Sequence, residues 1–186
     1  MSIKTVHAII AAAGLLLSGI VCAEECQLTV SQAEVNYQQI RRDDIVSTQQ
    51  NWHKLAEREV NVNVSCPEPR QMAVLMQGAS GEKGRVLFGA RGGIGLKIDN
   101  VTVDGRQYSA GKTTDRLNFT PESGATAPVY LRNSEAAIAL DNHTVPEGKQ
   151  MNFTVTLFPV LNDSMFNGNT DNTVIEADIR WQLLTK

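Results

Sequence analysis

Residues 173–186 read TVIEADIRWQLLTK, and this stretch carries the strongest structural signal in the chain. Its apolar side chains recur at every second position, and the side chains between them are polar. The apolar positions are Ile175, Ala177, Ile179, Trp181 and Leu183. A period of two predicts a β-strand with one buried face, because a helix would spread these residues around its circumference. The far edge of such a strand must pair with something or stay open to another chain, so what covers it bears directly on function.

The same alternation recurs along the chain and predicts an all-β protein. Strands are predicted within residues 28–37 (with an interruption near 31–32), 60–65, 71–77, 94–103 and 151–161, and weaker ones at 107–109 and 128–131. Pro67 and Pro69 are predicted to end the second of these strands just after Cys66. Residues 38–56 are polar and predict a surface connection with a short helical turn. Seven or so short strands separated by turns favour a β-sandwich.

Two stretches between the predicted strands are rich in turn-forming residues. Residues 84–105 contain six glycines, but neither nucleotide-binding glycine pattern is met and no helix pattern follows. Turns and a bulge in a β-protein explain these glycines better than a phosphate-binding loop does. Residues 162–172 are rich in Asn, Asp and Gly and predict a loop before the last strand.

The first 23 residues are predicted to be a secretory signal peptide. Lys4 gives a positive start, residues 8–21 are an apolar run, and small residues precede a cleavage site between Ala23 and Glu24. A transmembrane anchor is the alternative, but this run is short for a bilayer. An exported single domain, residues 24–186, is therefore expected.

The charge of the mature chain argues against a nucleic-acid partner, and its cysteine content favours one structural disulfide. The formal net charge of −3 becomes one unit more negative when Lys4 leaves, which argues against a nucleic-acid partner. Cys22 also leaves with the signal peptide, so Cys26 and Cys66 remain. An even number of cysteines in an oxidising compartment favours a disulfide. Closing a loop of this length stabilises a fold by about 4 kcal/mol on the chain-entropy estimate.

No constellation of residues in the sequence indicates catalysis. His53 and His143 lie in polar, loop-like sequence, and no cluster has the spacing of a metal site. Asp43 and Asp44 stand beside two arginines, which is typical of a solvated surface, and no GxSxG nucleophile motif is present. We therefore expect no enzyme activity, no bound metal and no cofactor.

Taken together, these features resemble the subunits of chaperone–usher fimbriae, the pilins. Cys26 follows the signal region, and Cys66 ends a valine-rich strand, where pilins place their single disulfide. Residues 92–98, GGIGLKI, and the later pair Asp104-Gly105 resemble a pilin strand and its turn. The two closing strands, 151–161 and 173–184, look like the final pair of a pilin. The resemblance extends over residues 26–186.

The resemblance implies an incomplete immunoglobulin-like β-sandwich whose missing last strand is donated by another chain. A periplasmic fimbrial chaperone would lend that strand first, and a neighbouring subunit would replace it in the fibre after passage through the outer-membrane usher. Ile175, Ala177, Ile179, Trp181 and Leu183 would then line the donor-strand groove. The protein would be a fimbrial subunit at the bacterial surface that acts in adhesion, with a host receptor as a further potential partner.

Two departures from the pilin pattern refine this expectation. Ordinary pilins carry a donor extension before the first cysteine, whereas cleavage after Ala23 leaves Glu24 and Glu25 before Cys26. Such a subunit would accept a strand without donating one, which predicts a minor or tip position. Pilins often have a penultimate aromatic residue, but Thr185 stands there and Trp181 is the nearest aromatic.

Other functions remain open at this point. The main alternative is a self-complete exported β-sandwich that binds a ligand in the periplasm or at the cell surface. A periplasmic chaperone of the same system is disfavoured, because those proteins have two domains. An exported hydrolase would require His53 or His143 to meet a buried carboxylate and a nucleophile in one pocket.

Overall fold

The protein is built almost entirely of antiparallel β-strands. The computed structural model describes residues 25–32, 35–40, 42–122, 128–165 and 174–186, so the predicted signal peptide lies outside the described residues. The strands are β1 (Gln27–Val30), β2 (Val35–Gln39), β3 (Ile45–Gln49), β4 (Trp52–Leu55), β5 (Arg58–Gln77), β6 (Val86–Phe88), β7 (Gly92–Val103), β8 (Arg106–Gln107), β9 (Ser109–Thr113), β10 (Val129–Leu131), β11 (Ala136–Leu140), β12 (Glu147–Asn162), β13 (Val174–Ala177) and β14 (Arg180–Thr185). Short 3-10 turns are η1 (Arg42–Asp44), η2 (Glu82–Gly84) and η3 (Asp163–Met165).

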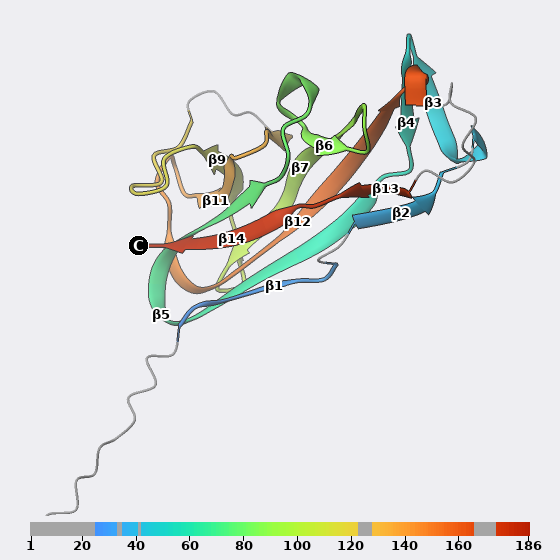
Figure 1. Ribbon diagram of the computed structural model, residues 1–186. Helices are drawn as coiled ribbons and strands as arrows, with labels where there is room; N and C mark the ends of the chain where they lie inside the picture. The colour runs from blue at the N-terminus through green and yellow to red at the C-terminus, as the bar shows by residue number, and fades with distance from the viewer. Residues whose placement is uncertain (1–24, 33–34, 41, 123–127, 166–173) are drawn as a thin grey trace, which may run out of the picture.

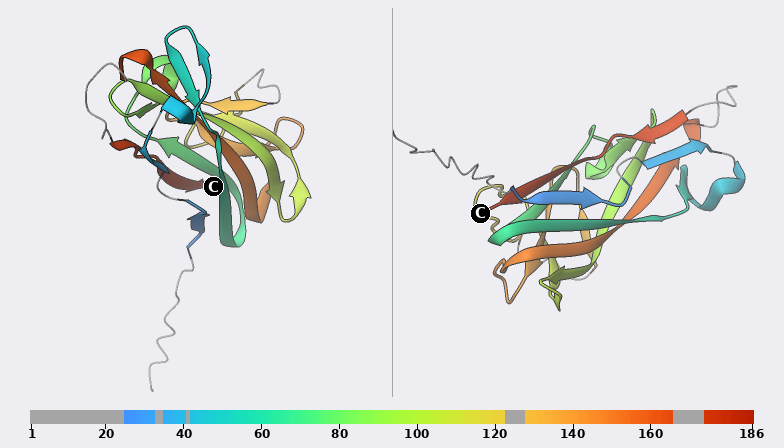
Figure 2. Two further views of the ribbon diagram at one scale, coloured as in Figure 1. Left: turned by 90° about the vertical axis from the view of Figure 1, so that its right-hand side faces the viewer. Right: turned by 90° about the horizontal axis from the view of Figure 1, so that it is seen from below.

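The 20-residue strand β5 organises the fold (Figure 1). Its first part, residues 58–65, pairs with β12, and residues 62–65 also pair with β1 on the other side. Its last part, residues 72–77, pairs with β14, and residues 73–75 also pair with β11. The main path of the sheet is β10-β7-β12-β5-β11-β9, and β5 bends so that its two parts run in opposite directions (Figures 1 and 2). This arrangement is consistent with a β-sandwich.

The prediction that Pro67 and Pro69 end a strand is wrong, because β5 runs through both prolines. Residues 66–69 form no register pair with β1, β11, β12 or β14. The pairing with β12 also shifts here, between Gly148 and Gln150. A proline without a neighbouring strand removes no ladder hydrogen bond, so the strand can continue. The prolines mark the bend of β5, not its end.

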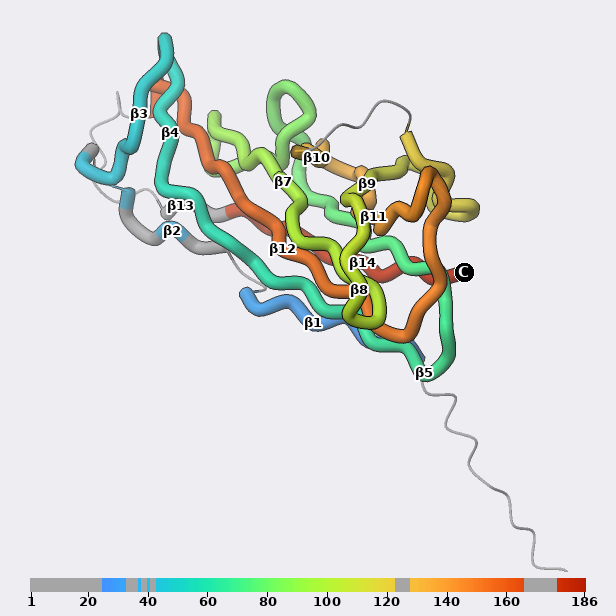
Figure 3. The backbone as a smooth tube through the Cα atoms, turned by 180° about the vertical axis from the view of Figure 1, so that it is seen from behind, coloured from blue at the N-terminus to red at the C-terminus, as the bar shows by residue number. Residues whose placement is uncertain are grey.

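Two further parts of the fold differ from the sequence prediction. Residues 38–56, predicted as a surface connection with a short helical turn, contain η1 but also the β3–β4 hairpin. Figure 3 shows this hairpin projecting at one end of the molecule. The prediction also missed β11, whose sequence AAIAL is buried at its first four positions and so shows no alternation. A strand covered on both faces carries no period-two signal.

The hydrophobic core fills the space between the two parts of the sheet. Its buried side chains come from both ends of β5, from β7, β11 and β12, and from the short link between β13 and β14. They include Val62, Val64, Val74, Met76, Leu96, Ile98, Val155, Leu157, Ala137 and Ile179. A second, smaller cluster covers the other face of β5's last part: Ala73, Leu75, Phe119, Ala136, Ile138 and Val145. These two clusters explain why residues 72–76 of β5 are all buried.

Cys26 and Cys66 form the predicted disulfide, which closes a loop with a sequence separation of 40. The bond joins the start of β1 to the point where β5 begins to bend. Next to it, Gln27 pairs with Ser65 and Val30 with Val62, so the covalent bond and the β1–β5 ladder hold the same two segments together.

Candidate functional site

The last strand, β14, has one paired edge and one unpaired edge within the described residues. It pairs with β5 from Arg180–Gln77 to Thr185–Met72. Just beyond, Lys186 and Gln71 exchange two backbone hydrogen bonds of 3.0 Å each. This pair shows which residue pairs of the ladder are hydrogen-bonded and which are not. Hydrogen-bonded and non-hydrogen-bonded pairs alternate in an antiparallel ladder. The backbone N–H and C=O groups of Trp181, Leu183 and Thr185 therefore point to the unpaired edge.

The first strand, β1, lies beside β14 on the same side of the molecule (Figures 1 and 2). Its ladder partner is β5, and no register pair joins it to β14 among the described residues. Leu28 and Val30 stand opposite the buried Val64 and Val62, and both are only half-buried at the core margin. Cα atoms of β1 and β14 approach within 8 Å. A strand inserted between them at this point would push them slightly apart, because strands are spaced about 4.8 Å apart.

The structure places the five predicted groove residues along β13, β14 and their junction. Ala177 is 8% exposed and Ile179 is 4% exposed, so both belong to the closed core. Trp181 and Leu183 are half-buried and pack against the core from β14. They stand opposite Met76 and Val74 of β5, both fully buried. The side chain of Ile175 lies outside the described residues. The open part of the predicted site is therefore Trp181 and Leu183, together with Leu28 and Val30 of β1, which the sequence prediction did not include.

One polar atom in this region lacks a partner. The indole nitrogen Nε1 of Trp181 is buried and has no hydrogen-bond acceptor among the described residues. Buried N–H groups are nearly always hydrogen-bonded, because leaving one unpaired costs about 1–3 kcal/mol. An acceptor arriving at the β14 edge would remove this cost.

At the opposite end of this side of the molecule, two strands near the chain ends, β2 and β13, pair with each other. β2 pairs with β13, with Ala177 opposite Val35 and Val174 opposite Gln39. Tyr37 of β2 packs edge-on against Phe88 at 5.3 Å, and its hydroxyl donates a hydrogen bond to the carbonyl of Ala56. Burial raises the pKa of Tyr37 to about 12, against the opposing effect of Arg58, whose guanidinium lies 4.0 Å from the ring centre. On this side of the molecule, β2 and β13 are thus paired with each other, whereas no register pair joins β1 and β14 among the described residues.

His53 does meet a carboxylate and a hydroxyl, but in a setting unlike a catalytic site. Its Nδ1 lies 2.9 Å from Thr48 Oγ1, and its Nε2 lies 3.0 Å from Asp163 Oδ1. Thr48 is simply its cross-strand neighbour in the β3–β4 hairpin. The carboxylate of Asp163 is 55% exposed and so lacks the buried setting that orients a catalytic histidine. These contacts connect the hairpin to η3.

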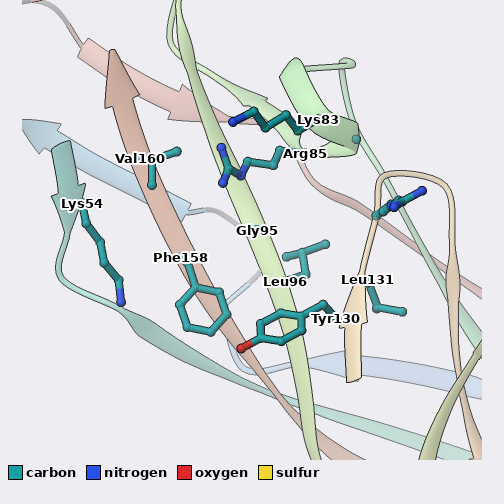
Figure 4. A pocket seen from close by; sticks show the side chains of 11 residues that line it. Lys54, Lys83, Arg85, Gly95, Leu96, Tyr130, Leu131, Phe158 and Val160 are labelled. Carbon is teal, nitrogen blue, oxygen red and sulfur yellow. The ribbon is translucent and has the colours of Figure 1, made fainter. Parts of the chain in front are cut away.

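A pocket on the outer face of the sheet was not predicted from the sequence (Figure 4). Its volume is about 430 Å³, and its lining comes from β4, η2, β7, β10 and β12. The lining residues are Lys54, Lys83, Gly84, Arg85, Gly95, Leu96, Tyr130, Leu131, Arg132, Phe158 and Val160. We call it the cationic pocket, since four of these side chains are basic and none is acidic. Because its residues are scattered over more than 100 positions, no local motif could reveal it.

The described residues contain no helix with the length and apolar character needed to span a membrane, and no group of three His, Cys, Asp or Glu side chains placed to hold a metal ion. No family model and no curated protein matches this chain.

Proposed function

We propose that the protein is a structural subunit of a chaperone–usher fimbria, in a minor or tip position, whose immunoglobulin-like domain accepts a donor strand from another chain. Its partners are a periplasmic fimbrial chaperone, the outer-membrane usher and a neighbouring subunit. The protein passes through the periplasm to the fimbria at the cell surface. Its role is assembly and adhesion, without catalysis.

The observation that carries this proposal is the edge of β14 that pairs with no strand in the described part of the chain. Trp181, Leu183 and Thr185 direct backbone hydrogen-bonding groups to that edge. Trp181 and Leu183 also leave apolar surface only half-buried there. A strand that pairs with this edge gains main-chain hydrogen bonds and covers apolar side chains, which is the physical basis of strand addition. It also brings carbonyl groups close to Trp181, whose Nε1 has no acceptor among the described residues.

The minor or tip position follows from the predicted cleavage site. Cleavage after Ala23 leaves Glu24 and Glu25 before Cys26, which the disulfide ties to β5. Two residues cannot span a neighbouring subunit, since an extended chain reaches about 3.5 Å per residue. The subunit would then receive a strand without passing one on.

Two observations favour the alternative, a self-complete binding domain. The pairing of β2 with β13 covers part of the edge with the protein's own chain. The close approach of β1 and β14 points the same way. In this alternative, the half-buried Trp181 and Leu183 would be the margin of a finished core.

Expression of the full-length chain in a periplasm, with and without a fimbrial chaperone, separates the two functions. A strand acceptor is expected to accumulate only as a one-to-one complex with the chaperone. A chain that is monomeric alone, unfolds cooperatively and does not bind the chaperone would contradict the proposal and favour the self-complete domain.

The variant Thr185→Pro tests the edge itself. It removes a backbone N–H that points away from β5, and proline is tolerated on such an edge, so the fold should remain. Chaperone binding should weaken, because one hydrogen bond is lost and the ring obstructs the added strand. Gln182→Thr is the matched control, since the Gln182 N–H faces β5 and its side chain is exposed. Equal chaperone binding by both variants would argue against strand addition at β14.

A further inference from the structure

The cationic pocket concentrates positive charge on a protein that is acidic overall. Lys54, Lys83, Arg85 and Arg132 line it, and its described lining has no carboxylate, although the chain carries a formal net charge of −3. Lys54 is paired with Glu57 at 2.6 Å. Within the described part of the chain, Lys83, Arg85 and Arg132 take part in no ion pair. Cations that line one hollow and have no acidic partner in its lining attract an anionic group.

Two aromatic rings form the other main part of the pocket. Phe158 of β12 and Tyr130 of β10 lie with ring centres 6.1 Å apart, and Figure 4 shows both rings in the hollow below Lys83 and Arg85. Tyr130 is 55% exposed, one of the most exposed large apolar side chains of the described residues. The amines of Lys54 and Lys97 lie 5.5 and 6.0 Å from the centre of the Phe158 ring. Aromatic faces carry partial negative charge and attract the C–H face of a sugar ring.

A second hollow of about 330 Å³ adjoins the first and shares Lys54, Lys83, Arg85 and Val160 with it. It adds Ser47, Gln49, Gln50 and Trp52 from the β3–β4 hairpin, and again no acidic residue. Amide and hydroxyl groups beside an indole ring suit a ligand with many hydroxyl groups. The combined space falls in the size range of small-ligand sites.

We propose that these two hollows bind a glycan through a sugar that carries a carboxylate, a sialic or a hexuronic acid. Arg85, which lines both hollows together with Lys83, holds the carboxylate, since a guanidinium matches its geometry with two parallel hydrogen bonds. Phe158 and Tyr130 support the sugar ring, and the hairpin contacts the next sugar. The inference goes beyond the proposed fimbrial role and does not depend on strand addition, because no lining residue belongs to β1 or β14.

The surroundings of the pocket favour a single carboxylate over a long polyanion. Glu57 and Asp99 hold the two lysines next to Phe158, and Glu82 adjoins Lys83 in the chain, so acidic groups border the basic area. At physiological salt, charges interact over about 8 Å. A compact anion in the pocket is therefore attracted by the basic side chains there, whereas a long polyanion would also extend over these carboxylates and be repelled by them. A sulfated polysaccharide or a nucleic acid would need a longer basic stripe.

Gly95 supplies a way to close the pocket without changing its charge. A Cβ at this position would lie 3.7 Å from Phe158, an ordinary contact, and Gly95 has no positive φ. Gly95→Val is therefore expected to fold and to fill the floor of the pocket. Arg85→Gln removes a charge and keeps the part of the side chain that covers Gly93. Arg70→Gln is the matched control, because Arg70 is exposed on β5 and lines neither hollow.

The test is calorimetric titration of the whole secreted chain, free or in its chaperone complex, with four probes. These are sialyllactose, lactose, a hexuronic-acid disaccharide and its neutral counterpart, and the two acidic probes show which source of carboxylate is preferred. One acidic sugar should bind at least about tenfold more tightly than its neutral counterpart. Arg85→Gln and Gly95→Val should each weaken it by about tenfold or more, and Arg70→Gln should not.

The inference would be overturned by equal binding of acidic and neutral sugars, by no binding of any of them, or by binding unaffected by both pocket variants. Tighter binding of a heparin fragment or of single-stranded DNA than of either acidic sugar would overturn it as well. None of these results changes what the chaperone experiment shows about β14, so the two proposals fail independently.

Discussion

Gly92 and Gly95, three positions apart in β7, are glycines for different reasons. A Cβ at Gly92 would lie 2.7 Å from the carbonyl oxygen of Val160 and would also collide with the carbonyl oxygen of Phe88. Both are backbone atoms that cannot move aside. A Cβ at Gly95 meets only Phe158, at ordinary contact distance. Close backbone packing requires the first glycine, whereas the second leaves room for the cationic pocket.

Gly92→Ala is therefore expected to destabilise the protein by about 1–3 kcal/mol, the usual cost of overpacking. Gly95→Ala should change the free energy of unfolding by no more than about 0.5 kcal/mol. Urea denaturation of the two variants with the disulfide intact measures the difference. Equal destabilisation would mean that β7 shifts to relieve the contact with Val160.

Asp115 organises the turn that places Phe119 in the smaller core cluster. Its carboxylate accepts hydrogen bonds from the backbone N–H groups of Asn118 and Leu117, each at 3.0 Å, and from the Thr120 hydroxyl at 2.7 Å. These bonds favour the ionised form, with the backbone of Asn118 contributing most, and they hold the pKa of Asp115 well below its ordinary value of 3.8. Phe119, at the end of this turn, is 1% exposed.

This low pKa predicts a loss of stability in acid. Because the pKa is lower in the folded than in the unfolded chain, the stabilisation is complete above the unfolded pKa and is lost as the pH falls below about 4. Asp115→Asn removes the titration, so the melting temperature of this variant should fall less steeply between pH 4 and pH 2. Parallel melting curves for the two proteins over this range would contradict the role given to Asp115.

Among the elements, β5 shows how a strand can serve both parts of a sheet. Its unpaired residues 66–69 carry both prolines, and the pairing partners change on either side of them. Pro67→Ala and Pro69→Ala should each lower the free energy of unfolding by less than about 1 kcal/mol, through the added freedom of the unfolded chain.

Moving the proline into the paired region should have a much larger effect. Asn63 pairs with Thr29 on one side and with Asn152 on the other, so Asn63→Pro introduces a ring where strands pack on both edges. A loss of about 3 kcal/mol or more is expected in the same denaturation experiment. A similar cost for Pro67→Ala would show that residues 66–69 carry pairing that stabilises the bend.

Alternating strands could be predicted from the sequence, and the other elements could not. β7, β12 and β14 have one face on the core and a more exposed face, and their period-two pattern identified them. β11 is covered by both clusters, β3 is largely exposed, and β4 is half-buried at its first three positions, so none of them alternates. Trp181 and Leu183 of the candidate site were identified, but Leu28 and Val30 were not, because their position depends on the pairing of β1.

At the scale of the whole molecule, the disulfide is the strongest constraint on the unfolded chain. The chain-entropy estimate for a 40-residue loop is about 4 kcal/mol, which is a large share of the 5–15 kcal/mol typical of a domain. The double variant Cys26→Ala/Cys66→Ala should lose about this much in chemical denaturation. A loss below about 1 kcal/mol would mean that the β1–β5 ladder alone already holds these segments together.

The same bond also determines how the domain responds to mechanical tension. When the chain is pulled from its two ends, force that enters at Cys26 passes directly to Cys66, and the 40-residue loop between them carries no load. The oxidised protein should therefore lengthen by about 140 Å less than the reduced protein when it unfolds in a single-molecule experiment. The N-terminal quarter of the domain is thereby shielded from extension. Force applied at the N-terminus therefore acts on β5 before it can separate β1 from β5.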